Sequence, residues 1–134
     1  MNQILQPPGW AKPKGYSNGI AVKGGTTVFV AGQVAFNSQG VIEKQSFAAQ
    51  FRKTLENTIA VLAEAGGKPE HIVRMTWYIL DKKEYLGAIR EVGAAYRELV
   101  GKHYPAMAVV QVSGLIEDEA KLEIETTAVI PETA

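Results

Sequence analysis

Two glutamates at alternating positions are the residues of this sequence best suited to chemistry. Glu123 and Glu125 lie in a β-type run at residues 121–130, and side chains two apart on a strand project from the same face. Two carboxylates in a partly desolvated site raise the pKa of at least one, which then stays protonated or serves as a base. The alternative is a pair of ordinary exposed glutamates on an outer strand. Gln33 and Gln111 are predicted to face the same way and could orient a water or a carbonyl.

The composition excludes several other kinds of chemistry. The chain has 134 residues, no cysteine, two histidines and a formal net charge of 0. Thiolate nucleophiles, disulfides and thiolate metal sites are therefore absent, and His71 and His103 are too far apart in the sequence to indicate a metal site. The balanced charge argues against a nucleic-acid partner. We expect neither a metal nor a cofactor.

The same sequence argues against a membrane location. No run of about 18 apolar residues occurs, and the N-terminal residues lack the basic and apolar regions of a signal peptide. We expect a soluble, cytoplasmic protein.

The hydrophobic pattern predicts one α+β domain over residues 1–134. Period-2 runs predict strands and period-3.6 runs predict helices, in the order β-β-α-β-α-β-β. This order predicts one mixed sheet with two helices on a single face, after an extended N-terminal arm at residues 1–18. Gly24 and Gly25 are predicted to form a hairpin turn between the first two strands. The expected elements are strands at 19–23, 26–36, 72–80, 106–115 and 121–130, and helices at 46–65 and 84–100.

Alternation divides the expected sheet into an apolar face and a mixed face. The apolar set should pack under the helices; it comprises Val28, Val30, Val34, Phe36, Val73, Met75, Trp77, Ile79, Ala108, Val110, Val112, Leu122 and Ile124. The mixed set comprises Thr27, Phe29, Ala31, Gln33, Arg74, Thr76, Tyr78, Met107, Val109, Gln111, Glu123, Glu125 and Thr127. A solvent-facing antiparallel sheet is one interpretation. We favour an interface between copies of the chain, with a small-molecule pocket at the subunit boundary.

Six segments together resemble the Rid/YjgF family of enamine and imine deaminases, older members of which were called endoribonucleases. They are GYSNGI (15–20), VFVAGQV (28–34), AAQFRKTLENTIAVLAEAGG (48–67), HIVRMTWYILD (71–81), HYPAMAVVQV (103–112) and KLEIETTAV (121–129). The resemblance covers nearly the whole chain. It implies a chorismate-mutase-like fold, a homotrimer with pockets between subunits, and hydrolysis of 2-imino or 2-enamino acids without metal or cofactor.

The resemblance also assigns roles to individual residues. Glu123 matches the glutamate that positions the attacking water. Tyr16 matches a pocket tyrosine, Gly32 a contact from the strand that follows it, and Val109 a main-chain contact. With Gln33 and Met107, these residues form the predicted substrate site.

Three positions depart from the family pattern. Met107 follows Pro105-Ala106 where the deaminases carry an arginine that pairs with the substrate carboxylate, and a thioether cannot replace a bidentate guanidinium. Ala31 stands in place of a serine and Gly93 in place of an asparagine. These departures imply a more apolar pocket with no evident anchor for an α-carboxylate.

Three functions are therefore open. The first is a deaminase whose substrate recognition does not depend on the missing arginine. The second is a non-catalytic, trimeric binding or chaperone-like protein. The third is an endoribonuclease, which zero net charge and the lack of a histidine pair make the weakest.

Overall fold

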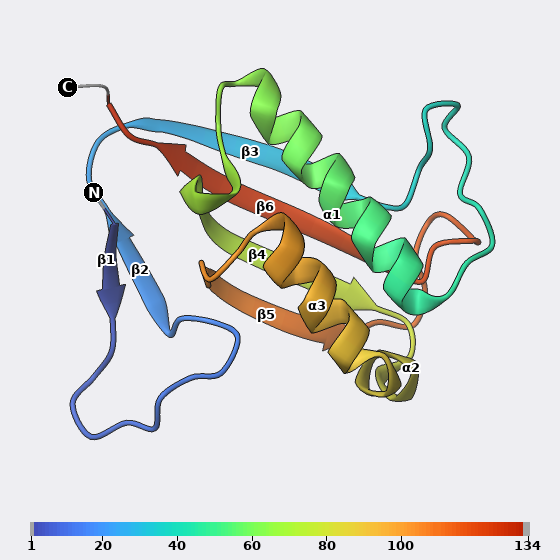
Figure 1. Cartoon of the computed structure of the whole chain (residues 1–134), viewed down its shortest axis with the longest axis horizontal. Coiled ribbons are helices and arrows are strands. Elements are labelled where there is room, and N and C mark those ends of the chain that lie inside the picture. Colours follow the sequence, from blue (N-terminus) through green and yellow to red (C-terminus); the bar gives the residue numbers. More distant parts are fainter. Residues whose placement is uncertain (1, 133–134) are drawn as a thin grey trace.

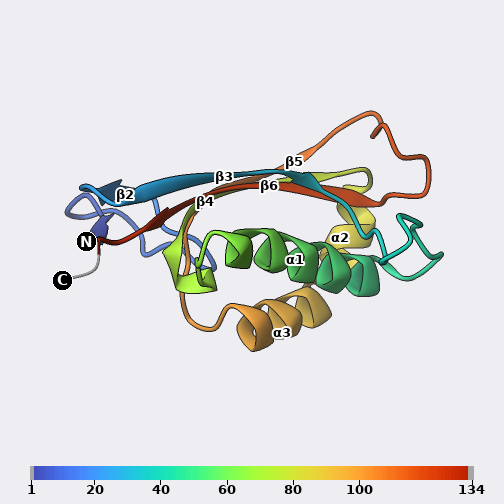
Figure 2. The ribbon, with the colours of Figure 1, turned by 90° about the horizontal axis from the view of Figure 1, so that it is seen from above.

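A mixed four-stranded sheet forms the centre of the molecule. The computed structural model describes residues 2–132. The strand order is β3-β6-β4-β5, and only β4 and β5 are parallel neighbours. All helices lie on one face (Figures 1 and 2), which confirms the predicted α+β class. The elements are β1 (Asn2–Leu5), β2 (Gly19–Val22), β3 (Thr26–Gln33), α1 (Phe47–Glu64), a 3-10 turn (Pro69–His71), β4 (Ile72–Ile79), α2 (Lys82–Gly87), α3 (Ile89–Leu99), β5 (Ala106–Gln111) and β6 (Leu122–Ile130).

Helix α1 provides most of the cover over the sheet. The Ser46 side chain caps its first turn by accepting a hydrogen bond from the Ala49 amide at 3.2 Å. Phe51, Leu55 and Leu62 are fully buried against the sheet, as the period-3.6 pattern predicts. Gln50 on the same helix is also buried, although it is polar. Its side chain is buried and bonds the chain just before β6, where it spans Glu119 O and Lys121 N at 2.9 Å each.

The N-terminal region forms a second, separate sheet. Residues 2–5, inside the expected extended arm, form β1 and pair antiparallel with β2. Gly24 and Gly25 therefore link two sheets, and the predicted hairpin between the first two strands is wrong. Gly25 has φ +82°, and a Cβ there would lie 2.5 Å from Ile130 O, so the link requires glycine. The ends of the expected domain, residue 1 and residues 133–134, lie outside the described residues.

The second helical segment is broken where one continuous helix was predicted. Asp81 caps α2 by accepting hydrogen bonds from the Lys83 and Glu84 amides at 2.9 and 3.3 Å. Ala88 then leaves helical geometry at φ −105°, ψ 10°, and α3 begins at Ile89. The break follows Gly87, a poor helix former, and a period count does not detect it because apolar residues continue on both sides.

The faces of the edge strand β5 are the reverse of the prediction. Met107 registers with Met75 and Val109 with Trp77, so Met107 and Val109 lie on the helix face. Ala108 and Val110 lie on the uncovered face, where Val110 is 40% exposed. Both residue sets of this strand are apolar, so alternation carries no information about which one is buried. A bulge at the start of β4 similarly buries Ile72 rather than Val73.

Candidate functional site

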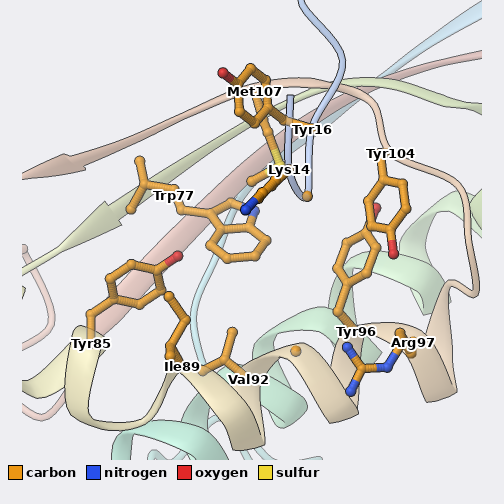
Figure 3. Close-up of a pocket in the computed structure, with 13 residues that line it drawn as sticks. Lys14, Tyr16, Trp77, Tyr85, Ile89, Val92, Tyr96, Arg97, Tyr104 and Met107 are labelled. Carbon is orange, nitrogen blue, oxygen red and sulfur yellow. The ribbon is translucent and has the colours of Figure 1, made fainter. Parts of the chain in front are cut away.

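A pocket of about 530 Å³ opens between the helices and strands β4 and β5. Trp77 of β4 lies at the centre of the pocket, near Met107 of β5 (Figure 3). Val109 of β5, which registers with Trp77, also lines it. Its volume falls in the range of sites that hold a small organic molecule, about 300 to 1,000 Å³. The remaining lining residues are Lys14, Gly15, Tyr16, Tyr85, Ile89, Val92, Gly93, Tyr96, Arg97 and Tyr104.

The N-terminal segment is attached to the start of β5. The Ser17 amide donates to Pro105 O at 3.0 Å, and its hydroxyl donates to Tyr104 O at 2.5 Å. Ser17 also forms an isolated parallel bridge with Ala106. Lys14 and Tyr16 lie within three residues of Ser17. These bonds therefore bring both side chains to the mouth of the pocket, opposite α3 (Figure 3).

Aromatic side chains form much of the pocket wall. Tyr96 and Tyr104 stack with their ring centres 5.7 Å apart. The ring centre of Trp77 lies 6.4 Å from that of Tyr85 and 6.3 Å from that of Tyr96. The Tyr96 hydroxyl donates to His103 O at 2.5 Å. Burial raises the pKa of Tyr96 and of Tyr85 above that of a free phenol. Both phenols therefore stay protonated and cannot act as bases near neutral pH.

A second group of predicted residues lies on the uncovered face of the sheet. The Glu123 side chain lies directly over Gly32, where a Cβ would lie 2.8 Å from the Glu123 Cδ. Among residues 2–132 the Glu123 carboxylate has no hydrogen-bond or ion-pair partner, whereas Glu125 accepts a 2.5 Å bond from the Tyr78 hydroxyl. That bond is the main cause of the raised pKa of Tyr78. Glu123 is thus the carboxylate of the pair left free to bind water.

The structure brings the predicted site residues together in two separate groups. Tyr16, Met107 and Val109 line the pocket. Gly32 and Glu123 meet on the opposite face of the sheet. The two glutamines join neither group: Gln33 and Gln111 register with Ile124 and Ile79, in the helix-facing set, so their expected position beside Glu123 is wrong. Gln111 instead accepts a bond from the Lys82 amide at 2.7 Å.

Two residues of the pocket were not predicted from the sequence. Lys14 and Arg97 both line the pocket, although the pattern indicated no cation there. Arg97 lies one helical turn after Gly93, a spacing that places two residues on one face of a helix. That spacing was a usable signal, because a glycine four residues before an arginine leaves the arginine room to fold back. Among the described residues, no group of His, Asp and Glu side chains could hold a metal ion.

Comparison with known proteins decides the family. Residues 10–130 match the family model described as Endoribonuclease L-PSP. The chain belongs to the Rid/YjgF family. A Rid/YjgF relative in Salmonella typhimurium, 32% identical over 78% of this chain and 80% of its own, is named 2-iminobutanoate/2-iminopropanoate deaminase. The family therefore includes enzymes that deaminate reactive intermediates.

Solved Rid/YjgF structures have the same fold. YyfB of Yersinia pestis, a Rid family protein, superposes with a TM-score of 0.83 at 31% identity, over 96% of this chain and 98% of its own. Escherichia coli TdcF with bound serine superposes with a TM-score of 0.68 at 33% identity, over 96% and 99%. None of the helices in residues 2–132 has the length and hydrophobicity that a membrane span requires.

Proposed function

We propose that this chain hydrolyses a reactive imine or enamine to a carbonyl compound and ammonia, with Glu123 positioning the water. The water oxygen adds to the imine carbon and the imine nitrogen takes up a proton. The carbinolamine then collapses: its hydroxyl proton passes to nitrogen as the C=O bond forms, and the C–N bond breaks to release ammonia. Glu123 accepts the proton of the attacking water and returns it to the leaving nitrogen. No change in oxidation state occurs, so water is the only co-reactant.

The contact between Gly32 and Glu123 is the observation that carries this proposal. The missing Cβ of Gly32 lets the Glu123 carboxylate lie against the backbone, and among residues 2–132 no protein group occupies its hydrogen-bonding positions, so it can hold a water. The buried Gln50 side chain bonds Glu119 and Lys121 just before β6. Lys121 lies two residues before Glu123, so these bonds fix the start of the strand that carries Glu123. The deaminase relative supports the reaction class.

We further propose that the two groups of site residues meet between copies of the chain. Within one copy, Glu123 and Met107 lie on opposite faces of the sheet, so one copy cannot apply both to one substrate. The uncovered face carries Phe29 with 78% of its surface exposed. Packing that face against the β5 edge and pocket of another copy buries Phe29 and places Glu123 over a pocket. A closed homotrimer, with a site at each boundary, satisfies this arrangement.

The test is ammonia release from 2-iminopropionate, generated in the assay, and from bulkier neutral imines. We expect turnover with at least one class and its loss in Glu123→Gln. Glu125→Gln is the matched control, because Glu125 lies on the same strand and face but bonds Tyr78. Lack of turnover with every imine, or full activity of Glu123→Gln, would refute the proposal.

A non-catalytic binding protein is the second candidate. Met107 and the aromatic walls give the pocket an apolar interior, which suits retention of a metabolite as well as its turnover. Native mass spectrometry that finds a stoichiometric ligand, together with no imine hydrolysis, would favour this candidate.

A further inference from the structure

We infer that Arg97 and Lys14 replace the missing arginine as the carboxylate anchor, and that the pocket selects an acid with a flat, apolar body. The inference takes this pocket as the substrate site, and in that respect rests on the proposed function. It corrects the expectation that the pocket lacks an anchor for an α-carboxylate. The substrate class that follows is a 2-imino acid with an aromatic side chain, and the product is the matching 2-keto acid.

The charge of the pocket is the first argument. Lys14 and Arg97 both line it, and no aspartate or glutamate does. Neither cation takes part in any of the ion pairs that the described residues form. A chain with zero net charge thus places two unneutralised cations at the mouth of one pocket. An anionic ligand group is the natural partner for such a pair.

The position of the Arg97 guanidinium is the second argument. A Cβ at Gly93 would lie 3.3 Å from Arg97 Nη1, so the arginine folds back over the glycine one turn earlier on α3. A longer side chain at position 93 would occupy the space that the guanidinium uses. Gly93 therefore allows Arg97 to lie along the pocket wall (Figure 3).

An unpaired indole is the third and independent argument. Trp77 is only 5% exposed, and its Nε1 is buried without a hydrogen-bond partner. A buried donor without a partner is unfavourable. The Lys14 side chain extends toward this indole (Figure 3). Nε1 has almost no accessible surface, so a ligand oxygen can accept from it only when the side chains that cover it move aside; the oxygen would then lie beside the Lys14 ammonium.

The rest of the lining defines the body of the ligand. Ile89, Val92 and Met107 supply apolar surface, and stacked Tyr96 and Tyr104 supply a flat wall. A short acid such as pyruvate would leave this surface in contact with water. An aromatic acid would cover it, which favours binding in proportion to the apolar area buried.

Phenylpyruvate is the test ligand, with phenylacetone as its uncharged counterpart and pyruvate as the short acid. The chain has two tryptophans, Trp10 and Trp77, so binding is read by Trp77 fluorescence in a Trp10→Phe background. We expect phenylpyruvate to bind about tenfold or more tightly than phenylacetone, because hydrogen bonds to charged groups are among the strongest in proteins. We expect a similar preference over pyruvate, because the phenyl ring buries apolar surface that pyruvate leaves exposed.

The anchoring variants are Arg97→Gln and Lys14→Gln. We expect each to weaken phenylpyruvate binding about three- to tenfold and to leave phenylacetone binding unchanged. Arg90→Gln, on the same helix but outside the pocket lining, and Lys12→Gln are the matched controls. Thermal melts check that the variants stay folded, which we expect because both side chains are exposed.

Two results would overturn the inference: equal affinity for phenylpyruvate and phenylacetone, or wild-type phenylpyruvate binding in both Arg97→Gln and Lys14→Gln. The same titrations in Glu123→Gln separate this inference from the proposed reaction. If imines are not hydrolysed but the charge-dependent binding persists, the proposed reaction fails and the anchor stands. If imines are hydrolysed and the charge of positions 14 and 97 has no effect, the anchor fails alone.

Discussion

Met107 and Glu123 lie on opposite faces of one sheet, although the sequence pattern places them on the same face. Met107 registers with the buried Met75, and Glu123 registers with Tyr78 on the uncovered face. The residue that departs from the deaminase pattern and the proposed catalytic carboxylate therefore belong to different surfaces of the chain.

Glutamine at position 123 should remove catalysis without affecting the fold. General acid–base groups contribute about 100- to 10,000-fold to a rate, so we expect Glu123→Gln to lower the rate of ammonia release by about 100-fold or more. Because the Glu123 carboxylate has no partner among the described residues, the melting temperature should stay within about 2 °C of wild type. Glu125→Gln should keep most of the activity. Equal losses in the two variants would contradict a specific role for Glu123.

Alanine at position 32 should act through Glu123. The new Cβ would lie 2.8 Å from the Glu123 Cδ, so the carboxylate must move, and we expect a loss of activity. The side chain that moves is flexible and has no partner among the described residues, so the free energy of unfolding should fall by less than about 1 kcal/mol. In a Glu123→Ala background Gly32→Ala should cause no further loss of activity, which a double-mutant cycle measures. Gly114→Ala is the control, because a Cβ at Gly114 meets nothing within 4 Å. A further loss of activity in the double variant would show that Gly32→Ala does not act through Glu123.

Arginine at position 107 should restore activity on short 2-imino acids. Met107 lines the pocket beside Trp77, and a guanidinium there could form a bidentate pair with a substrate carboxylate. The strength of hydrogen bonds to charged groups corresponds to a gain of about tenfold or more in kcat/KM for 2-iminopropionate. Met107→Lys should give a smaller gain, because an ammonium lacks the fork geometry. If Met107→Arg has no effect on short substrates, methionine at this position does not explain their exclusion.

Phenylalanine at position 96 should loosen the connection that precedes β5. The Tyr96 hydroxyl bonds His103 O, and leaving that carbonyl unpaired should cost about 1 to 2 kcal/mol in urea unfolding. Tyr104→Phe, which removes a hydroxyl from the stacked partner ring, should cost less.

The same residue predicts a pH dependence. Burial raises the pKa of Tyr96 in the folded state, so above the pKa of a free tyrosine, about 10, the folded state holds its proton more strongly than the unfolded state. This contribution to stability is fully present below pH 10 and is lost as the pH rises from there toward the folded pKa. Urea midpoints measured between pH 8 and 11 should fall less steeply in Tyr96→Phe than in wild type. Parallel slopes would remove Tyr96 as the cause.

A charge at position 29 should separate the copies. Light scattering of the wild-type chain should give the mass of a trimer. Phe29→Glu places a carboxylate at a side chain that is 78% exposed on the uncovered face, so it should lower that mass toward a monomer and reduce activity together. Ile116→Glu, at a loop residue that is 93% exposed, should do neither. A monomeric wild-type chain would contradict the shared site.

The sequence by itself determined the element types, the fold class and the family. Helix α1 could be read from its apolar stripe and Ser46 cap, and Glu123 and Glu125 from their alternation, because these signals are local and depend on one element at a time. Gly32 emerged only through the family resemblance, since nothing local in the sequence reports what lies above a backbone.

Only the tertiary structure decided which surfaces meet. Strand β5 is apolar on both faces, so its orientation depends on its register with β4 and not on its own pattern. Arg97 and Lys14 come from segments more than eighty residues apart. They reach one pocket because Ser17 bonds the chain before β5 and because Gly93 leaves space above α3. The Ser17 bonds join distant parts of the chain, and neither hydrophobic periodicity nor residue spacing records them; only the spacing of Gly93 and Arg97 on α3 is visible in the sequence.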